Sequence, residues 1–254
     1  MRASELTRMF ELEDRYWWFV ARRALVRALL AHHLGKEALG LSAGPRGLTI
    51  LDVGCGTGAT LGVLAQFGRV TGLDRAPEAL AYCRRRSQCR LVLARAEELP
   101  VRDGAADVIT ALDLLEHLPD DGAAMREFAR ALRPGGLLVV TVPALPWLWS
   151  EHDEALDHLR RYQASRLRAV LEQAGLTVLR LSPLITLLLV PIAALRLVQR
   201  LSRHRGPAPR TAFIVPPRPI NWLLAAVLRL ENAWALRWDL PVGVSLMAVA
   251  RRPE

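Results

Sequence analysis

Lysine is almost absent from this chain of 254 residues, in which Lys36 is the only lysine among 34 basic residues. Arginine therefore supplies the basic excess of 34 over 25 acidic residues, a formal net charge of +9. The arginines are spread along the sequence without a basic run of the kind that marks a nucleic-acid tail. We expect no nucleic-acid partner, and an anionic membrane surface is the better polyanionic candidate.

Cysteine is scarce too, and long apolar runs are missing. Cys55, Cys83 and Cys89 are too few and too irregularly spaced for a disulfide framework or a metal motif. The first 15 residues lack the continuous apolar core of a secretion signal, and no apolar stretch reaches the roughly 20 residues of a bilayer-spanning helix. The sequence therefore favours a cytoplasmic protein without a metal, and its length suits one domain with an insertion.

A glycine-rich segment follows a short apolar run in the first third of the chain. It reads Thr49-Ile50-Leu51-Asp52-Val53-Gly54-Cys55-Gly56-Thr57-Gly58. Glycines have no Cβ atom, so they take unusual backbone angles and let a ligand approach the main chain. The pattern predicts a buried strand, a loop that binds an adenosine cofactor, and a helix over residues 59–66.

The glycine spacing alone leaves two cofactors open. Gly54, Gly56 and Ala59 also satisfy the looser dinucleotide fingerprint, with Asp74 at the separation of a ribose-binding acid. Asp52 favours a different ligand, because its carboxylate would be unhelpful beside a pyrophosphate and suits a ligand with an ammonium and a sulfonium group. The segment resembles the first motif of the class I S-adenosylmethionine-dependent methyltransferases, in particular the methyltransferase-11-like family, and this implies S-adenosyl-L-methionine as cofactor.

Later segments extend the resemblance in the family's order and spacing, including an Arg-Pro-Gly-Gly turn at residues 133–136. Asp74, at the end of the second strand, would accept both ribose hydroxyls; its alternative role is a turn or helix cap. Arg95 departs from the family, since many relatives have there an aspartate that accepts from the adenine amino group, which arginine cannot do. A surface charge pair is the alternative for Glu97. The cofactor-binding residues that the resemblance implies are Asp52, Gly54, Cys55, Gly56, Gly58, Asp74, Ala96, Glu97 and Asp113.

The candidates for the acceptor side follow the fourth and fifth strands, at the sheet edge where ligands bind in parallel α/β folds. His117 is a candidate general base because its ordinary pKa suits that role, although a Glu-His pair recurs in relatives with unlike substrates. Residues 143–162 form a loop rich in polar and aromatic side chains, which is poor core material. From this loop we select His158, Arg161 and Tyr162, with His117, His158 and Tyr162 as the catalytic candidates; a solvated loop held by salt bridges is the alternative.

Residues 6–38 have a helical pattern that contains four successive aromatic residues at 16–19. Four in a row cover every face of a helix, so part of the block should cover a ligand or another surface. The resemblance implies a lid over the cofactor; packing of the rings on the domain is the alternative.

A second unusual region lies between the sixth and seventh predicted strands. Two apolar stretches, residues 183–195 and 220–230, are too short to span a bilayer and have tryptophan or arginine at their margins, which fits helices that lie in a membrane interface. A helical cover over the substrate pocket or a dimer face is the alternative. The basic residues that would face an anionic surface are Arg196, Arg200, Arg203 and Arg205.

These observations lead to one prediction of fold and function. The resemblance implies a doubly wound, Rossmann-like α/β sheet of strand order 3-2-1-4-5-7-6 with strand 7 antiparallel. We expect a lid (1–48), a cofactor-binding core (49–181 and 242–254) and a helical insertion (182–241). The predicted function is methyl transfer from S-adenosylmethionine to a small-molecule or lipid-linked acceptor, in an unknown oligomeric state. The alternatives are a non-catalytic membrane-associated module and a nicotinamide-dependent oxidoreductase.

Overall fold

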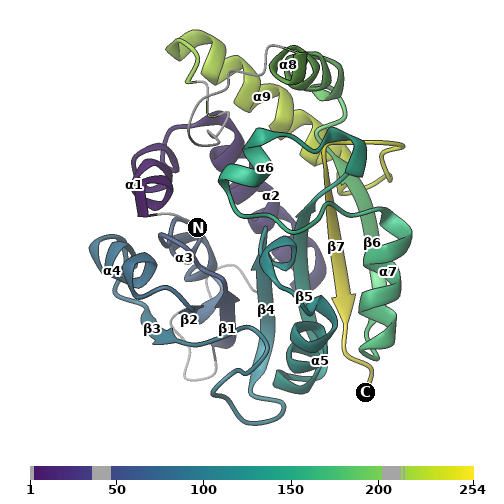
Figure 1. Cartoon of the computed structure of the whole chain (residues 1–254). Helices are drawn as coiled ribbons and strands as arrows, with labels where there is room; N and C mark the ends of the chain where they lie inside the picture. The colour runs from purple at the N-terminus through teal and green to yellow at the C-terminus, as the bar shows by residue number, and fades with distance from the viewer. Residues whose placement is uncertain (1–2, 36–46, 202–212, 214) are drawn as a thin grey trace.

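The structure, a computed structural model, describes residues 3–35, 47–201, 213 and 215–254 (Figure 1). Its centre is a seven-stranded sheet of order β3-β2-β1-β4-β5-β7-β6, in which β7 runs antiparallel to both neighbours. The predicted strand order is therefore confirmed. The strands are β1 (Leu48–Val53), β2 (Gly68–Asp74), β3 (Arg90–Leu93), β4 (Ala106–Leu112), β5 (Leu132–Pro143), β6 (Thr177–Leu184) and β7 (Ser245–Arg251).

Helices cover both faces of this sheet. On one face the core contains side chains of α2 (Trp17–Leu34), α3 (Leu61–Leu64), α4 (Pro77–Arg86) and α9 (Arg218–Ala235). On the other face it contains those of α5 (Asp121–Ala131) and α7 (Ala164–Gln173). The middle strands are buried on both sides, which is why they read as nearly continuous apolar runs.

Some elements differ from their predicted bounds. The N-terminal helix is divided into α1 (Ala3–Leu12) and α2, which residues 13–16 separate; its predicted end at Ala38 lies outside the described residues. The helix after the glycine loop shrinks to the single turn of α3. The Arg-Pro-Gly-Gly segment belongs to β5, which begins at Leu132 because that residue pairs with Ala106 of β4 before the register shifts.

Two helices, α8 (Leu189–Leu201) and α9, lie in sequence between β6 and β7. Two asparagine side chains attach α9 to the rest of the chain. Asn232 donates a hydrogen bond to the Ala21 carbonyl oxygen (3.0 Å), and Asn221 accepts one from the Trp17 amide (3.0 Å). Within the described residues, no helix is long and apolar enough to cross a membrane.

Candidate active site

A cavity of about 480 Å³ lies at the carboxyl edge of β1, β2 and β4, where the sheet order reverses. Such a crevice is the usual ligand site of an open α/β sheet. Segments far apart in the sequence share its wall: the glycine loop, α1, α2, the loop after β5, and the α8 and α9 region. Figure 1 shows α1, α6 (Glu151–Ala155), α8 and α9 above this edge.

The glycine loop forms the floor of the cavity. The amides of Gly54 and Cys55 both donate to the Leu73 carbonyl oxygen, at 2.8 and 3.0 Å, which holds the loop against β2. Gly56 has φ +55°, a left-handed conformation that favours glycine, and a Cβ added there would meet no atom within 4 Å. Gly54, Cys55 and Gly56 line the cavity, so the loop presents its main chain to a ligand; Gly58 packs instead against Cys83.

Asp74 lies at the end of β2 and lines the same cavity. Its two oxygens accept hydrogen bonds from the Gly56 and Ala76 amides, both at 2.9 Å. Burial raises the pKa of Asp74, and the two amides oppose that rise. A carboxylate has about four lone-pair sites, so both oxygens can still accept from a diol. Asp74 thus shapes the glycine loop and keeps acceptor capacity towards the cavity.

Asp52 lies beneath the loop and is not among the residues that line the cavity. The Thr110 hydroxyl donates to its Oδ1 at 2.6 Å. Burial raises the pKa of Asp52 to about 6, against the lowering effect of this hydrogen bond. Its assignment to the cofactor stays a prediction.

Ala96, Glu97 and Asp113 also line the cavity, and their assignment to the cofactor stays a prediction. Glu97 also forms an ion pair with Arg95, at 3.5 Å. The surface charge pair considered as its alternative role is therefore present too. Asp113 has a left-handed backbone (φ 52°) and forms an ion pair with Arg22 of α2. Arg22 also stacks on Trp18, 4.6 Å from the ring centroid, and so joins the N-terminal region to the end of β4.

The four aromatic residues at 16–19 line the cavity, and two of them also belong to a small buried cluster. Tyr16, Trp17, Trp18 and Phe19 all line the cavity, and Tyr16 and Phe19 are buried together with Phe213. Glu13, between α1 and α2, accepts a hydrogen bond from the hydroxyl of Thr57 in the glycine loop. The sequence gives no local signal for this contact, which places the N-terminal helices over the loop.

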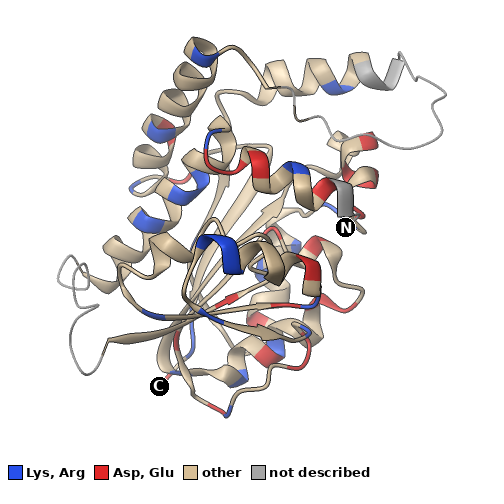
Figure 2. Cartoon of the chain, turned by 90° about the vertical axis from the view of Figure 1, so that its left-hand side faces the viewer, with Lys and Arg blue, Asp and Glu red and all other residues tan. Residues whose placement is uncertain are grey.

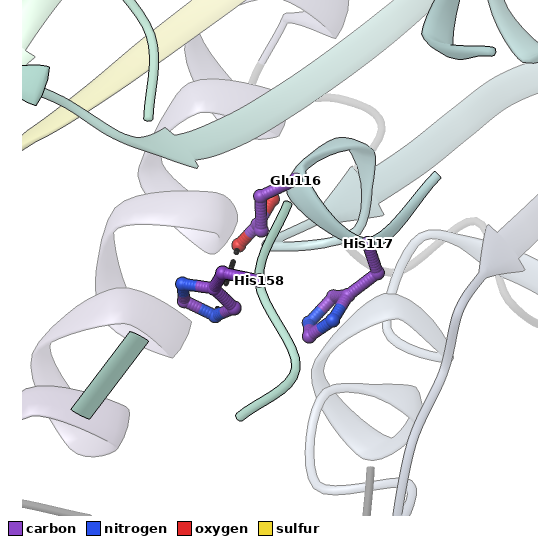
Figure 3. Close-up of side chains that lie close together, drawn as sticks. All are labelled: Glu116, His117 and His158. Atoms are coloured by element: carbon purple, nitrogen blue, oxygen red, sulfur yellow. Dashed lines mark ion pairs between the residues drawn. The ribbon is translucent and has the colours of Figure 1, made fainter. Parts of the chain in front are cut away.

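Three titratable side chains from two segments meet on the acceptor side (Figure 3). Glu116 and His117 lie on the one-turn 3₁₀ helix after β4 (Leu115–His117), and His158 comes from the loop after α6. One donor atom from each lies within 4.8 Å of the others. The separation between Nε2 of His158 and Oε1 of Glu116 is 4.0 Å, longer than the roughly 3.3 Å between ligands of a tetrahedral zinc ion.

Charges and burial differ within this cluster. Glu116 is fully buried, and burial raises its pKa well above the ordinary value, with a further rise from Asp113. Burial, with a smaller contribution from the neighbouring His158, lowers the pKa of His117 to about 3. His158 contacts a carboxylate, because its Nδ1 lies 3.0 Å from Oδ1 of Asp153.

Tyr162 is not brought to the cavity, in contrast to its selection from the sequence. The side chain is completely buried, its hydroxyl donates to Asp121 at 2.7 Å, and it lies 3.3 Å from the Leu115 carbonyl oxygen. Arg161, by contrast, lines the cavity and donates to Asp153 at 2.8 Å. The composition of residues 143–162 indicated poor core material, yet part of this loop is buried, because internal partners satisfy its polar groups.

Other cavity-lining residues were not selected from the sequence as part of the site. Glu13 and Arg22 contribute from the N-terminal region, Glu116 from the segment after β4, and His152 from α6. Arg196, on α8, was expected at a membrane surface. It lines the cavity and donates to the Ser150 hydroxyl. Only the tertiary arrangement of α8 reveals this orientation.

Known proteins resemble this chain in sequence and in fold. Residues 51–140 match the family described as "Methyltransferase domain". A Mycolicibacterium smegmatis protein named "Probable S-adenosylmethionine-dependent methyltransferase" is 31% identical over 170 residues, which are 65% of this chain and 61% of that protein. A ubiquinone biosynthesis O-methyltransferase of Xanthomonas axonopodis is 33% identical over 145 residues, 54% of this chain and 60% of that enzyme.

Among solved structures, the protein bound to the Trm112 methyltransferase activator of Haloferax volcanii has the same fold, with a TM-score of 0.58 and 22% identity. That likeness covers 99% of this chain and 94% of the other. The matches to the two curated relatives span 61% and 60% of their lengths. Motif order, sheet topology and these matches agree. The chain therefore matches a methyltransferase domain over residues 51–140 and resembles the class I S-adenosylmethionine-dependent methyltransferases in its motifs and sheet order.

Proposed function

We propose that the protein transfers a methyl group from S-adenosyl-L-methionine to a small-molecule acceptor. The observation that carries this proposal is the continuity of the cavity, which runs from the glycine loop and Asp74 to the histidines of the α6 region and to Ile192 of α8. A cofactor at the loop and an acceptor beneath α8 would share one cavity. The similarity to enzymes named for ubiquinone biosynthesis also supports a small-molecule acceptor.

The residues at the glycine loop fit the cofactor of this family. Gly56 leaves open space where a side chain would stand, and the carboxylate of Asp74 retains acceptor sites for the two ribose hydroxyls. Ala96 and Glu97 would lie on the adenine side, and Asp113 near the methionine part. When bound, S-adenosylmethionine supplies a methyl group on a positively charged sulfur, so the leaving group is already good.

The protein's own contribution is then to align the reactants and to exclude water. Tyr16, Trp17 and Trp18 cover the cavity from the N-terminal side, and the Arg22–Asp113 ion pair holds this cover against β4. Two reactants held in one orientation avoid much of the entropy cost of a bimolecular step.

The test has a binding part and a transfer part. Calorimetry should detect S-adenosylmethionine binding that Gly56→Val abolishes, because a branched side chain would fill ligand space and strain the left-handed backbone. Gly62→Ala is the matched control, since Gly62 lies on the exposed side of α3 with nothing within 4 Å. Labelled methyl groups should then move into separated lipid or aqueous extracts. Cofactor binding without any transfer would instead favour a non-catalytic module, and preferred binding of a nicotinamide nucleotide would favour an oxidoreductase.

We further propose that α8 and α9 contact a membrane surface peripherally. Large apolar side chains on these helices are exposed: Val190 at 76%, Leu230 at 70% and Trp222 at 69%. Figure 2 shows both helices as mostly uncharged, with isolated basic residues. Arg218 and Arg229 are exposed on α9 and would attract anionic lipids. Arg196 faces the cavity, while Arg203 and Arg205 lie outside the described residues.

Flotation with anionic vesicles tests this contact. The protein should float at low salt, and salt should weaken the binding without abolishing it, because insertion of apolar side chains persists. Trp222→Ser with Leu230→Ser should abolish flotation while cofactor affinity stays unchanged. Leu93→Ser, at an apolar position on the edge strand β3 that is also exposed (59%), is the control. Substitutions are preferable to deletion here, because α9 packs on α2. Absence of flotation by the unaltered protein would leave a pocket cover or a dimer face as the role of these helices.

A further inference from the structure

We propose that His158 is the general base of the transfer, that Asp153 positions it, and that the methylated atom is a hydroxyl oxygen. This inference rests on the proposed methyl-transfer function and names the chemical class of the acceptor. Three independent features carry it: the hydrogen bonding of Asp153, the gap between His158 and Glu116, and the contrast between His158 and His117.

Asp153 is fixed through both of its carboxylate oxygens. Oδ1 accepts from Nε of Arg161 at 2.8 Å and lies 3.0 Å from Nδ1 of His158, while Oδ2 accepts from the Ser150 amide at 3.0 Å. Burial alone would raise the pKa of Asp153, but the hydrogen bond from His158 and the charge of Arg161 outweigh it and lower that pKa. A carboxylate at Nδ1 selects the tautomer with its proton on Nδ1 and leaves the lone pair of Nε2 free.

That lone pair faces Glu116 across a gap of suitable size. Nε2 of His158 lies 4.0 Å from Oε1 of Glu116, and both residues line the cavity. Neither oxygen of Glu116 has a hydrogen-bond partner in the part of the chain that the structure describes. The gap is too long for a direct hydrogen bond, but an oxygen about 2.8 Å from each atom would bridge them.

Glu116 and Nε2 of His158, on the two sides of this gap, favour a hydroxyl group between them. Burial raises the pKa of Glu116 well above the ordinary value, so the neutral acid donates, whereas Nε2 accepts. A hydroxyl can donate to Nε2, accept from Glu116 and keep a second lone pair for the methyl group. An amine nitrogen has one lone pair and cannot both accept from Glu116 and attack. A methylene carbon offers neither interaction.

His117 lacks the support that His158 has. Its Nδ1 lies 3.4 Å from the Asp157 carbonyl oxygen, a weak contact, and burial lowers its pKa to about 3. Such an imidazole holds an abstracted proton poorly. The ionisable and charged groups that face His158 are Asp153, His152, Glu116, His117 and Arg161.

The proton and electron balance of the step is complete within the site. The acceptor oxygen forms a bond to the methyl carbon with one lone pair, the C–S bonding pair stays on sulfur, and the hydroxyl proton moves to Nε2. The resulting imidazolium is stabilised by the negative charge of Asp153, and its proton later passes to solvent.

The first test identifies the methylated atom. Product made from methyl-labelled S-adenosylmethionine and cell extract is treated with hydriodic acid, which releases the methyl of a methoxy group as volatile methyl iodide. We expect the label in the volatile fraction. Label that stays on nitrogen or carbon would overturn this inference while leaving methyl transfer intact. Absence of all transfer, with cofactor bound, would instead refute the proposed function.

The second test concerns the residues themselves. With that product assay, His158→Gln should lower kcat by about 100-fold or more, within the range of general bases, and Asp153→Asn by at least about tenfold. Cofactor affinity should be unchanged, and His32→Gln, at an exposed position on α2, should be neutral. The pH profile of the rate should change shape in Asp153→Asn and in His158→Gln, which a merely structural role would not produce.

A readout without turnover completes the test. Nitrogen NMR of labelled histidine should show His158 protonated at Nδ1 in the wild type, and a mixture of tautomers in Asp153→Asn. A wild-type His158 protonated at Nε2 would overturn the assignment. Activity that a chelator removes and a divalent cation restores would also overturn it, because the cluster would then act through a metal.

Discussion

Replacement of Asp74 by alanine should impair both the loop and the cofactor site. The carboxylate accepts two amide hydrogen bonds at 2.9 Å, from Gly56 and Ala76, so the variant leaves both donors without that acceptor. A hydrogen bond to a charged group is worth about 1.5–3 kcal/mol, and Asp74 is half-buried. We expect a loss of about 2 kcal/mol or more in the free energy of unfolding.

The loss in cofactor affinity is a separate quantity. Two charge-assisted hydrogen bonds to the ribose disappear with the carboxylate, which we expect to cost about 1.5–3 kcal/mol of binding free energy. The dissociation constant of S-adenosylmethionine should therefore rise roughly 10- to 150-fold. Asp74→Asn retains one acceptor oxygen, so it should recover part of the stability but little of the affinity.

Calorimetry measures the cofactor affinity of these variants, and urea denaturation measures their free energy of unfolding. Asp107 provides a matched control, because it also accepts a backbone hydrogen bond, from the Thr49 amide at 2.8 Å, but does so at the start of β4 and away from the cavity. Asp107→Ala should lose stability and keep its affinity. If Asp74→Ala binds S-adenosylmethionine as tightly as the wild type, Asp74 is a structural acid of the loop and the ribose assignment fails.

Three further substitutions follow from the site. Burial raises the pKa of Asp52 from 3.8 to about 6, so the folded state holds this proton more tightly than the unfolded state and loses stability as pH rises through that range. Asp52→Asn should therefore be more stable than the wild type at pH 7.5, by up to about 3 kcal/mol. In denaturation curves this difference in stability should close towards pH 4. Tyr162→Phe should cost about 1 kcal/mol of stability, because Asp121 loses a buried hydrogen bond, and should leave kcat nearly unchanged; a large fall in kcat at unchanged stability would return Tyr162 to the catalytic residues. Arg22→Ala removes the ion pair with Asp113 and should raise the rate of cofactor release in stopped-flow experiments. An unchanged release rate would mean that this ion pair does not hold the N-terminal helices over the cofactor.

The sheet and the cofactor side could be predicted because their signals are local. A buried parallel strand leaves a continuous apolar run, and a loop that approaches a ligand leaves glycines at fixed spacing. Gly56 and Asp74 lie 18 residues apart, yet each is marked by its own position at a strand end. The order of such strands in this family then places both at one edge of the sheet.

The acceptor side could not be predicted in the same way, because its contacts join distant segments. Arg196 meets Ser150 over 46 residues, and His117 meets Asp157 over 40. Nothing near Arg196 in the sequence tells whether it faces lipid or the cavity, since that depends on how α8 is rotated against the domain. Tyr162 was selected from a loop that looked too polar for a core, but Asp121 satisfies its hydroxyl inside the protein.

The family match covers residues 51–140, whereas α1, α2, α6, α8 and α9 all lie outside it. Relatives that share the cofactor half therefore say little about the molecule that receives the methyl group. The cavity wall combines apolar side chains such as Ile192 and Leu195 with the polar pair Glu116 and His158. A molecule with an apolar body and one hydroxyl would suit both the apolar and the polar part of this wall. Its apolar body would lie beneath α8 and α9, whose outer faces expose large apolar side chains.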